Sequence, residues 1–422
     1  MLNYACVLPH PPLAVPSVGQ GKESRIRNTL KAYKEVAGEI ADIAPQTIVV
    51  ITPHSINYAD YFHISPGKEA QGDFAMFGVA ETKLQAQYDE SLAQEIAKLM
   101  PEAGEMGERD PSLDHGTTVP LWFVNEAYTD YKLVRISQSG MSAEDHYRLG
   151  QAIRKAAENL GRKVVLIASA DLSHKLDTED GKNYDLLAIR AMESGNFEEL
   201  SKLSEEERRQ AAECGHNSLM ILAGAFEGVA MSPRLLSYEG PFGVGYAVAD
   251  FKAYDEYQLL ARASLEYTVN NGAIMRVPKD IPAEMLTSRA GVFVSIQKHG
   301  RLRGCIGTIA PSTENIAQEI MQNAVSAGLY DNRFNQVEAH ELPHLSYKVD
   351  VLAEPEDIPD ASYLDVKRYG VIVRFGDRRG LLLPNLEGID SIEEQIAIAC
   401  QKAGIPSGAD IHLQRFEVIR HG

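Results

Sequence analysis

The sequence predicts a two-domain protein in which an α/β domain precedes an α+β domain. Its 422 residues are more than one ordinary hydrophobic core accommodates. Over the first 250 residues, short β-branched runs alternate with helical patterns, which is typical of a mainly parallel or mixed sheet flanked by helices. Beyond that point, hairpin-like segments stand beside helices, as in α+β domains.

The predicted strands of the first domain are short apolar runs. The first run spans Tyr4 to Leu8, and the last lies within FGVGYAVADF at 242–251. Between these two come the runs TIVVIT (47–52), YKLVRIS (131–137) and KVVLIAS (163–169), with helical patterns at 26–43 and 144–161. This alternation predicts βαβ units around one sheet.

We place the domain boundary near residue 253. A helical pattern opens there, with Asp255 as a suitable N-cap and Gly272 as a C′ stop. The segment at 291–309 then alternates like a hairpin that turns at His299–Gly300. The remaining predicted elements are a helix at 312–330, strands within 345–353 and 370–384, and a helix at 391–404. The predicted domains are therefore 1–253 and 255–422.

Composition narrows the classes of partner. The net charge of −18 argues against nucleic acid, because phosphate binding requires a basic surface. No apolar stretch approaches the roughly 20 residues that span a bilayer, and the N-terminus shows no signal-peptide pattern. The cysteines (Cys6, Cys214, Cys305 and Cys400) are widely spaced, which is typical of reduced thiols. We therefore expect a cytoplasmic protein that binds neither nucleic acid nor membrane.

Three histidines follow predicted strands of the first domain. His10 stands among prolines that stop the first strand and fix the backbone, in LPHPP. His54 ends the strand segment VITPHS, and His174 follows another strand in SADLSH. Because the carboxyl ends of parallel strands share one edge of a sheet, these side chains can converge. His115, in a turn before a predicted helix, could overhang the same edge.

A metal ion at this edge needs a third ligand beyond His10 and His54. Glu213 and His216 fall three residues apart at the start of an apolar helix, so both lie on one helical face. Two imidazoles and one carboxylate leave positions open for substrate and dioxygen, as in non-haem Fe(II) oxygenases. The alternative for Glu213 is a carboxylate that stabilises the helix N-terminus, and we weigh the two roles equally. Glu239 is a further candidate carboxylate.

Four motifs, LPHPP, VITPHS, LDHGTTVPL and SADLSH, resemble class III extradiol ring-cleavage dioxygenases of the protocatechuate dioxygenase β-subunit type, over roughly residues 1–252. Memo proteins share that fold. The resemblance implies Fe(II), or another divalent metal such as Zn, held by His10, His54 and a glutamate. It implies proton transfer by His115 and His174, and a small catechol-like substrate that is cleaved with O₂.

The third ligand is where this sequence departs from the family pattern. The family glutamate lies at the head of a late helix, where Glu213, His216 and Asn217 compete, and we favour Glu213. Two other functions stay open: a non-oxygenase metal enzyme on this scaffold, and a metal-binding or adaptor protein of the Memo type. The presence of both histidines assigned to proton transfer favours an enzyme, because metal storage does not need them.

Motifs of the second domain resemble the AMMECR domain over about residues 257–420. They are LRGCIGT (302–308), YDNRF (330–334), GLLLPN (380–385) and QKAG (401–404). Arg303, Cys305, Asp331 and Arg333 are polar groups in or near turns that could line a pocket. For Cys305 we favour a packed thiol over a nucleophile, and Asp331 with Arg333 can form a structural ion pair. The resemblance implies a radical-SAM partner system, and a homo-oligomer is a further expectation.

Overall fold

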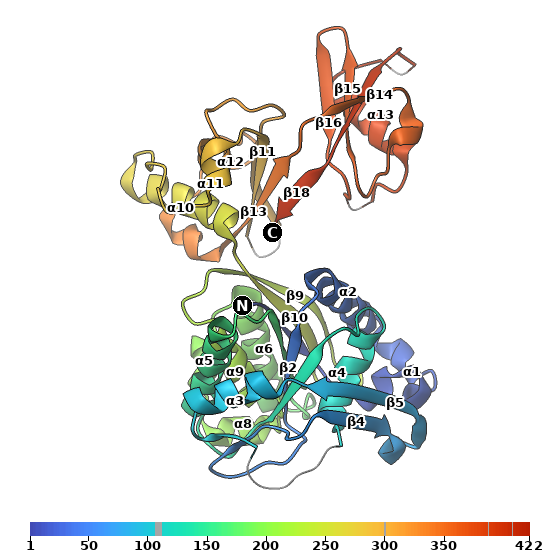
Figure 1. Cartoon of the computed structure of the whole chain (residues 1–422), viewed down its shortest axis with the longest axis vertical. Helices are drawn as coiled ribbons and strands as arrows, with labels where there is room; N and C mark the ends of the chain where they lie inside the picture. Colours follow the sequence, from blue (N-terminus) through green and yellow to red (C-terminus); the bar gives the residue numbers. More distant parts are fainter. Residues whose placement is uncertain (106–111, 299–300, 387, 407) are drawn as a thin grey trace. The chain divides into compact units, whose positions relative to one another are not determined.

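The chain divides into two compact units, Met1–Ala253 (unit 1) and Tyr254–Gly422 (unit 2). Figure 1 shows the computed structural model, which describes residues 1–105, 112–298, 301–386, 388–406 and 408–422. The predicted turn at His299–Gly300 lies outside the described residues. Each unit contains its own sheets and helices. Among the described helices, none is both long and apolar enough to cross a membrane.

Unit 1 is built on one eight-stranded mixed sheet. Its strands are β1 (Leu2–Leu8), β2 (Thr47–Thr52), β4 (Glu69–Phe74), β5 (Val79–Tyr88), β7 (Lys132–Ser137), β8 (Val164–Ser169), β9 (Met231–Glu239) and β10 (Tyr246–Ala253). The strand order is β4-β5-β7-β2-β8-β1-β10-β9. Neighbours from β5 through β1 run parallel, whereas the outer pairs are antiparallel. The short strands β3 (Phe62–His63) and β6 (Ala103–Gly104) pair separately. The sheet confirms the predicted mixed α/β class.

Helices cover both faces of this sheet (Figure 1). They are α1 (Pro16–Gly19), α2 (Arg27–Ile43), α3 (Glu90–Leu99), α4 (His115–Asn125), α5 (Ala143–Asn159), α6 (Glu179–Ser194), α7 (Glu198–Ser201), α8 (Glu205–Ala211) and α9 (His216–Ala225). One core cluster includes Leu149 of α5 and Leu222 of α9, and the other includes Val36 of α2 and Phe123 of α4. Because both faces are covered, β2 and β8 are buried at every position, which explains their continuous apolar sequences.

Two glycines allow α5 and α9 to cross at very short range. A Cβ atom on Gly150 would lie 1.9 Å from the Ile221 carbonyl oxygen. A Cβ atom on Gly224 would lie 1.9 Å from the Tyr147 carbonyl oxygen. Any larger residue would therefore force the helices apart. This packing holds α9 in place, and the first turn of α9 lies near the candidate site.

Unit 2 contains two four-stranded antiparallel sheets. The first joins β11 (Gly291–Lys298), β12 (Arg301–Gly307), β13 (Leu345–Leu352) and β18 (Val418–His421) in the order β12-β11-β13-β18. The second joins β14 (Glu356–Ile358), β15 (Gly370–Phe375), β16 (Arg378–Leu382) and β17 (His412–Phe416) in the order β14-β17-β15-β16. Its helices are α10 (Glu256–Asn271), α11 (Ala283–Thr287), α12 (Ile316–Leu329) and α13 (Ile392–Lys402). The predicted α+β class is confirmed.

The first helix of unit 2 begins and ends where its capping residues predict. The Asp255 carboxylate accepts the backbone N–H groups of Tyr257 and Gln258, at 3.0 and 3.1 Å. Gly272 ends the helix in the left-handed conformation, with φ of 64°. Capping of this kind satisfies backbone groups that the helix itself leaves without a partner.

Candidate metal centre

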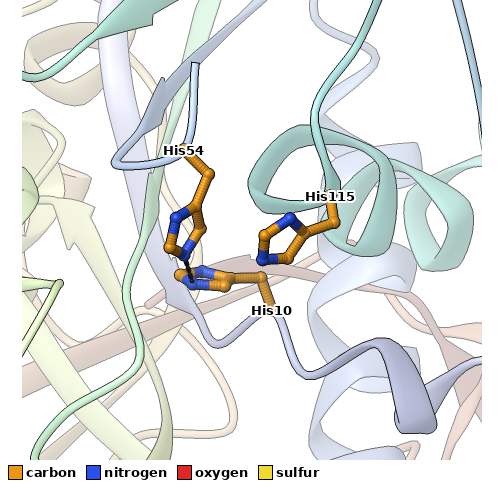
Figure 2. A group of neighbouring side chains, drawn as sticks. All are labelled: His10, His54 and His115. Atoms are coloured by element: carbon orange, nitrogen blue, oxygen red, sulfur yellow. Dashed lines mark hydrogen bonds between the residues drawn. The ribbon is translucent and has the colours of Figure 1, made fainter. Parts of the chain in front are cut away.

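Three neighbouring parallel strands of unit 1 bring histidines to one edge of the sheet. In the strand order β2-β8-β1, the carboxyl ends of the strands lie together. His10 stands two residues beyond the end of β1, His54 stands two residues beyond the end of β2, and His115 is the first residue of α4. Figure 2 shows the three rings gathered at this edge. The predicted convergence of the first two histidines is therefore present in the structure.

The spacing of these rings suits a metal ion. The Nε2 atoms of His10 and His54 lie 3.0 Å apart, and each of the three histidines has a ring nitrogen within 4.8 Å of the others. The His54 and His115 rings stack with their centroids 4.2 Å apart. Two nitrogens that bind adjacent positions of one ion at about 2.1 Å are about 3.0–3.4 Å apart. The His10–His54 pair already has that separation.

Ser169, the last residue of β8, determines which nitrogen of His10 faces the cluster. The Ser169 hydroxyl donates to the Gly116 carbonyl at 2.5 Å, so it accepts the Nδ1–H of His10 at 2.8 Å. The lone pair of His10 therefore lies on Nε2, the atom that faces His54. Metal-binding histidines commonly have such a partner on the other nitrogen.

The three imidazoles are neutral near pH 7. Burial holds the pKa of His10 well below its usual range. Burial and the neighbouring His115 ring lower the pKa of His54 to about 4. Burial also lowers the pKa of His115. Neutral imidazole is the form that binds metal ions, so metal binding at His54 Nε2 requires a change of tautomer that moves its proton to Nδ1.

A polar network fixes the segments that carry His54 and His115. The Thr52 hydroxyl donates to the Asp114 carboxylate at 2.5 Å and accepts the backbone N–H of His54 at 3.2 Å. The buried guanidinium of Arg135 lies 3.7 Å from the same carboxylate. Because Asp114 directly precedes α4, this network sets the position of His115 relative to His54.

His174 lies at the rim of the cluster. It is exposed, and its backbone N–H donates to the Ala211 carbonyl at 3.2 Å. Its charge contributes to the lowered pKa values of His10 and His54, so it lies close to both. Within the cluster, His10 is buried, His115 is half-buried and His54 is exposed, so His174 and His54 are the rings that solvent reaches most easily. An exposed imidazole suits exchange of a proton with a substrate or with solvent.

Two further side chains lie next to His10, and neither was predicted from the sequence. The Asp171 carboxylate accepts the backbone N–H of His10 at 2.7 Å, and its other oxygen lies 3.9 Å from His10 Nε2. Burial raises the pKa of Asp171 to about 7. The Cys214 Sγ atom lies 3.5 Å from the same Nε2 atom. Signals for both were present, because Asp171 stands inside SADLSH and Cys214 directly follows Glu213.

Glu213 lies outside the three-histidine cluster. Its carboxylate accepts the backbone N–H of His216 at 2.6 Å, at the start of α9. Burial raises its pKa, while the hydrogen bond from His216 opposes that shift. This contact is the helix-stabilising role that the sequence weighed equally against metal binding. The assignment of Glu213 as a metal ligand stays a prediction.

The other candidates for the third ligand have different surroundings. The Glu239 carboxylate accepts the backbone N–H and the hydroxyl of Thr29, at 2.8 and 2.7 Å, near the start of α2. The Asn217 side-chain oxygen accepts from Arg208 at 3.0 Å. His216 is fully buried. None of the three belongs to the histidine cluster found among the described residues.

The four polar residues singled out in unit 2 form hydrogen bonds and ion pairs with their neighbours. Arg303 pairs with Glu341 at 2.9 Å, and Arg333 pairs with Asp331 at 2.7 Å. Asp331 also accepts the backbone N–H of Cys305 at 2.9 Å. These contacts hold the segment at 330–334 against β12. A pocket lined by these residues stays a prediction.

Unit 1 is thus an α/β domain whose sheet edge carries a possible three-histidine metal site. The chain belongs to the family described as the catalytic LigB subunit of aromatic ring-opening dioxygenase, which matches residues 4–249. An AMMECR1 domain matches residues 259–421. The resemblances drawn from the motifs of both domains are therefore confirmed.

Relatives match either the whole chain or a part of it. Protein CA_C1420 of Clostridium acetobutylicum is 39% identical over 469 aligned positions, which cover 100% of this chain and 99% of its own. A protein of Thermotoga maritima is 46% identical over 159 positions, covering 37% of this chain and 91% of its own. The crystal structure of uncharacterized protein PH0010 from Pyrococcus horikoshii covers 39% of this chain and 88% of its own at 31% identity, with a TM-score of 0.36.

Proposed function

We propose that this protein is a metal-dependent enzyme of the extradiol dioxygenase type, which uses Fe(II) and O₂ to cleave a catechol-like ring. Family membership supports the reaction type. The single observation that carries the proposal is the pair of His10 and His54, with Nε2 atoms 3.0 Å apart and one tautomer fixed by Ser169. A pair of neutral imidazoles at that spacing fits a divalent ion.

His10 and His54 would hold the metal, and Glu213 is the carboxylate that the family resemblance implies. A bound Fe(II) ion would supply open positions for the two oxygens of a catechol and for dioxygen. His174, exposed beside the cluster, would accept a phenolic proton from the substrate, since partial burial lowers its pKa and leaves the ring neutral near pH 7. His115, stacked on His54, would donate a proton or orient the reacting oxygen.

A cavity beside the cluster suits a small aromatic substrate. Its volume is about 230 Å³, and its lining includes His115, Phe77 and Leu84. The Phe77 and His115 rings meet edge-on with their centroids 5.6 Å apart. Of the cluster, His115 lines this cavity, and its other lining residues include polar side chains as well as apolar ones. A flat ring placed there would contact His115, Phe77 and Leu84. We further propose a cytoplasmic location, a homo-oligomer and a radical-SAM system as partner.

The proposal is tested by purifying the protein without oxygen and measuring its metal content. Oxygen uptake is then followed with a panel of catechols, and the ring-opened products are identified. We expect stoichiometric iron and uptake of one O₂ per product. Bound iron without uptake for any catechol would contradict the dioxygenase assignment.

The position of Cys214 favours a second candidate, a metal enzyme that does not use dioxygen. A thiolate sulfur and an imidazole nitrogen that share a tetrahedral zinc ion are about 3.5 Å apart, which is the observed separation of Cys214 Sγ and His10 Nε2. A donor set of two histidines and one thiolate suits zinc better than an extradiol iron site. Stoichiometric zinc that depends on Cys214, with no oxygen uptake, would support this alternative.

A further inference from the structure

A groove in unit 1 lies at the far end of α9 from the histidine cluster. It encloses a cavity of about 720 Å³ between the start of α5, the segment at 195–201, and the chain from the end of α9 to the start of β9. Met220 is the residue of α9 in the groove lining that is nearest to the first turn, and it stands four residues beyond His216, about 6 Å along the helix. The lining includes none of the three clustered histidines. The groove is therefore distinct from the candidate metal centre.

The floor of the groove is apolar. Phe197, Met220 and Phe226 are almost fully buried beneath it, with exposed fractions of 6%, 1% and 3%. Val229 and Met231 are half-buried at its side. The apolar surface that a ligand can cover therefore belongs to the half-buried Ala143, Ala223, Val229 and Met231, and covering it would lower the free energy of the complex. Methionine side chains adapt their shape to different partners, which suits a surface that receives another protein.

The rim of the groove is acidic. Glu144 of α5, Glu198 of α7 and Glu227 beyond α9 are exposed, and all three line the groove. Its lining residues include no lysine or arginine. Glu198 pairs with Lys202, and Glu227 accepts a hydrogen bond from Gln151, both outside the lining. The carboxylates come from three separate elements, so they surround the floor instead of forming one cluster.

We propose that this groove binds an amphipathic, basic helix of a partner protein. Apolar side chains of that helix would cover the half-buried Ala223, Val229 and Met231, and its lysines or arginines would face the three glutamates. Peptide helices commonly bind in this way, with apolar residues spaced i, i+3, i+4 and i+7 as anchors. A helix that carries several cations matches three separated carboxylates, whereas a small amine would match one. The net charge of −18 also favours a cationic ligand.

The test uses the full chain and a labelled 14-residue model helix with leucines at the anchor spacing and lysines elsewhere. Binding is followed by fluorescence anisotropy at about 0.15 M salt, so that distant charges are screened. The double variant Glu144→Gln/Glu227→Gln should raise the Kd about 2-fold to 30-fold, the range expected for two lost surface charge pairs. The matched control is Glu81→Gln/Glu126→Gln, which removes the same charge from exposed positions elsewhere in unit 1.

A second variant probes the floor. Ala223 is half-buried in α9 and lines the groove, so Ala223→Leu should fill part of the cavity and weaken binding about tenfold or more. The fold of this variant is checked by circular dichroism before binding is measured. Equal binding by the two double variants, or equal binding of a peptide in which glutamate replaces lysine, would overturn the proposal. Octylamine binding that depends on Glu144 and Glu227, without peptide binding, would show that the groove takes a small cation instead.

Discussion

The Nε2 atoms of His10 and His54 face each other at 3.0 Å, although 44 residues separate them in the chain. Each histidine also has a supporting hydrogen bond. His10 Nδ1–H donates to the Ser169 hydroxyl, and the backbone N–H of His54 donates to the Thr52 hydroxyl. Side chains placed this close, neutral and supported in this way are preorganised for a shared ligand. Because His10 Nε2 carries the lone pair, His54 Nε2–H donates to it, and a metal ion bound by both nitrogens would take the place of that proton.

Replacing Ser169 with alanine should weaken metal binding without unfolding unit 1. The variant removes the acceptor of the His10 Nδ1–H, so the ring loses its fixed tautomer and orientation. Loss of such a partner typically costs about 10–100-fold in metal affinity. The affinity is measured by competition with a chelator of known strength.

Ser137→Ala is the matched control for this variant. Ser137 is buried at the end of the neighbouring strand β7, and its hydroxyl has no hydrogen-bond partner within the described part of the chain. The control should therefore keep its metal affinity. Equal losses in the two variants would show that Ser169 does not act through His10.

Glu213→Ala and Cys214→Ala separate the two candidates for the third ligand. If Glu213 acts only at the start of α9, its loss should lower the free energy of unfolding by about 0.3–1 kcal/mol and leave the metal content unchanged. If Cys214 is a ligand, Cys214→Ala should lower the metal content about as strongly as His54→Ala. Elemental analysis and denaturant unfolding measure both quantities. The opposite pattern, with metal lost only from Glu213→Ala, would restore the family glutamate as the ligand.

His174→Ala and His115→Ala should keep the metal and lose turnover. Positioned acid–base groups typically contribute about 10²–10⁴-fold in rate, so we expect losses on that scale with a catechol that the wild type cleaves. Single-turnover kinetics and metal content are measured on the same samples. The two residues differ in position: His174 is exposed and outside the cluster, whereas His115 is one of the three clustered histidines. Metal loss from His115→Ala would make that residue a ligand.

Buried His146 should make unit 1 less stable as the pH falls from 6.5 toward 4. Its Nδ1–H donates to the Ser142 carbonyl at 2.8 Å and its Nε2 accepts the Ser139 N–H at 3.3 Å, so only the neutral ring satisfies both. Burial lowers its pKa to about 4, below the usual value of 6.5. Between pH 6.5 and about 4, His146 is therefore protonated in the unfolded chain and neutral in the folded chain, so the free energy of unfolding decreases as the pH falls.

The variant His146→Gln isolates this contribution. Between pH 7 and pH 5, the wild type should lose about 1–2 kcal/mol more stability than the variant, because the groups shared by both proteins cancel. The single tryptophan, Trp122, lies in α4, so its fluorescence reports the unfolding of unit 1. Parallel pH profiles for the two proteins would contradict the neutral state of His146.

The sheet edge could be predicted because it depends on a rule of chain geometry. The carboxyl ends of neighbouring parallel strands lie at one edge of a sheet. His10 and His54 each come just after such a strand, so their side chains were expected to converge. The strands β4, β5 and β9 were not predicted from the sequence. At the edge strand β9 most residues are only half-buried, so the sequence lacks the continuous apolar run of β2 and β8.

The third ligand could not be predicted because helix starts and metal sites use the same residue type. A carboxylate before α9 suits both roles. The structure shows the local contact of Glu213 with the His216 N–H, which belongs to the helix-stabilising role, and Glu213 lies outside the histidine cluster. Asp171 and Cys214 approach His10 from 161 and 204 residues away along the chain. Their proximity follows from the packing of the β8 end and the α9 start against β1, and local sequence patterns do not encode it.

Metal content is the most direct test of the central claim, that His10 and His54 hold one divalent ion. The test compares the wild type with His10→Ala, His54→Ala and the double variant His10→Ala/His54→Ala. Each protein is purified without oxygen, loaded with Fe(II) or Zn(II) and freed of excess metal. Bound metal is then measured by elemental mass spectrometry. We predict one ion per chain in the wild type and less than a tenth of that in the variants, with the fold retained by circular dichroism. Full occupancy in the double variant would contradict the claim.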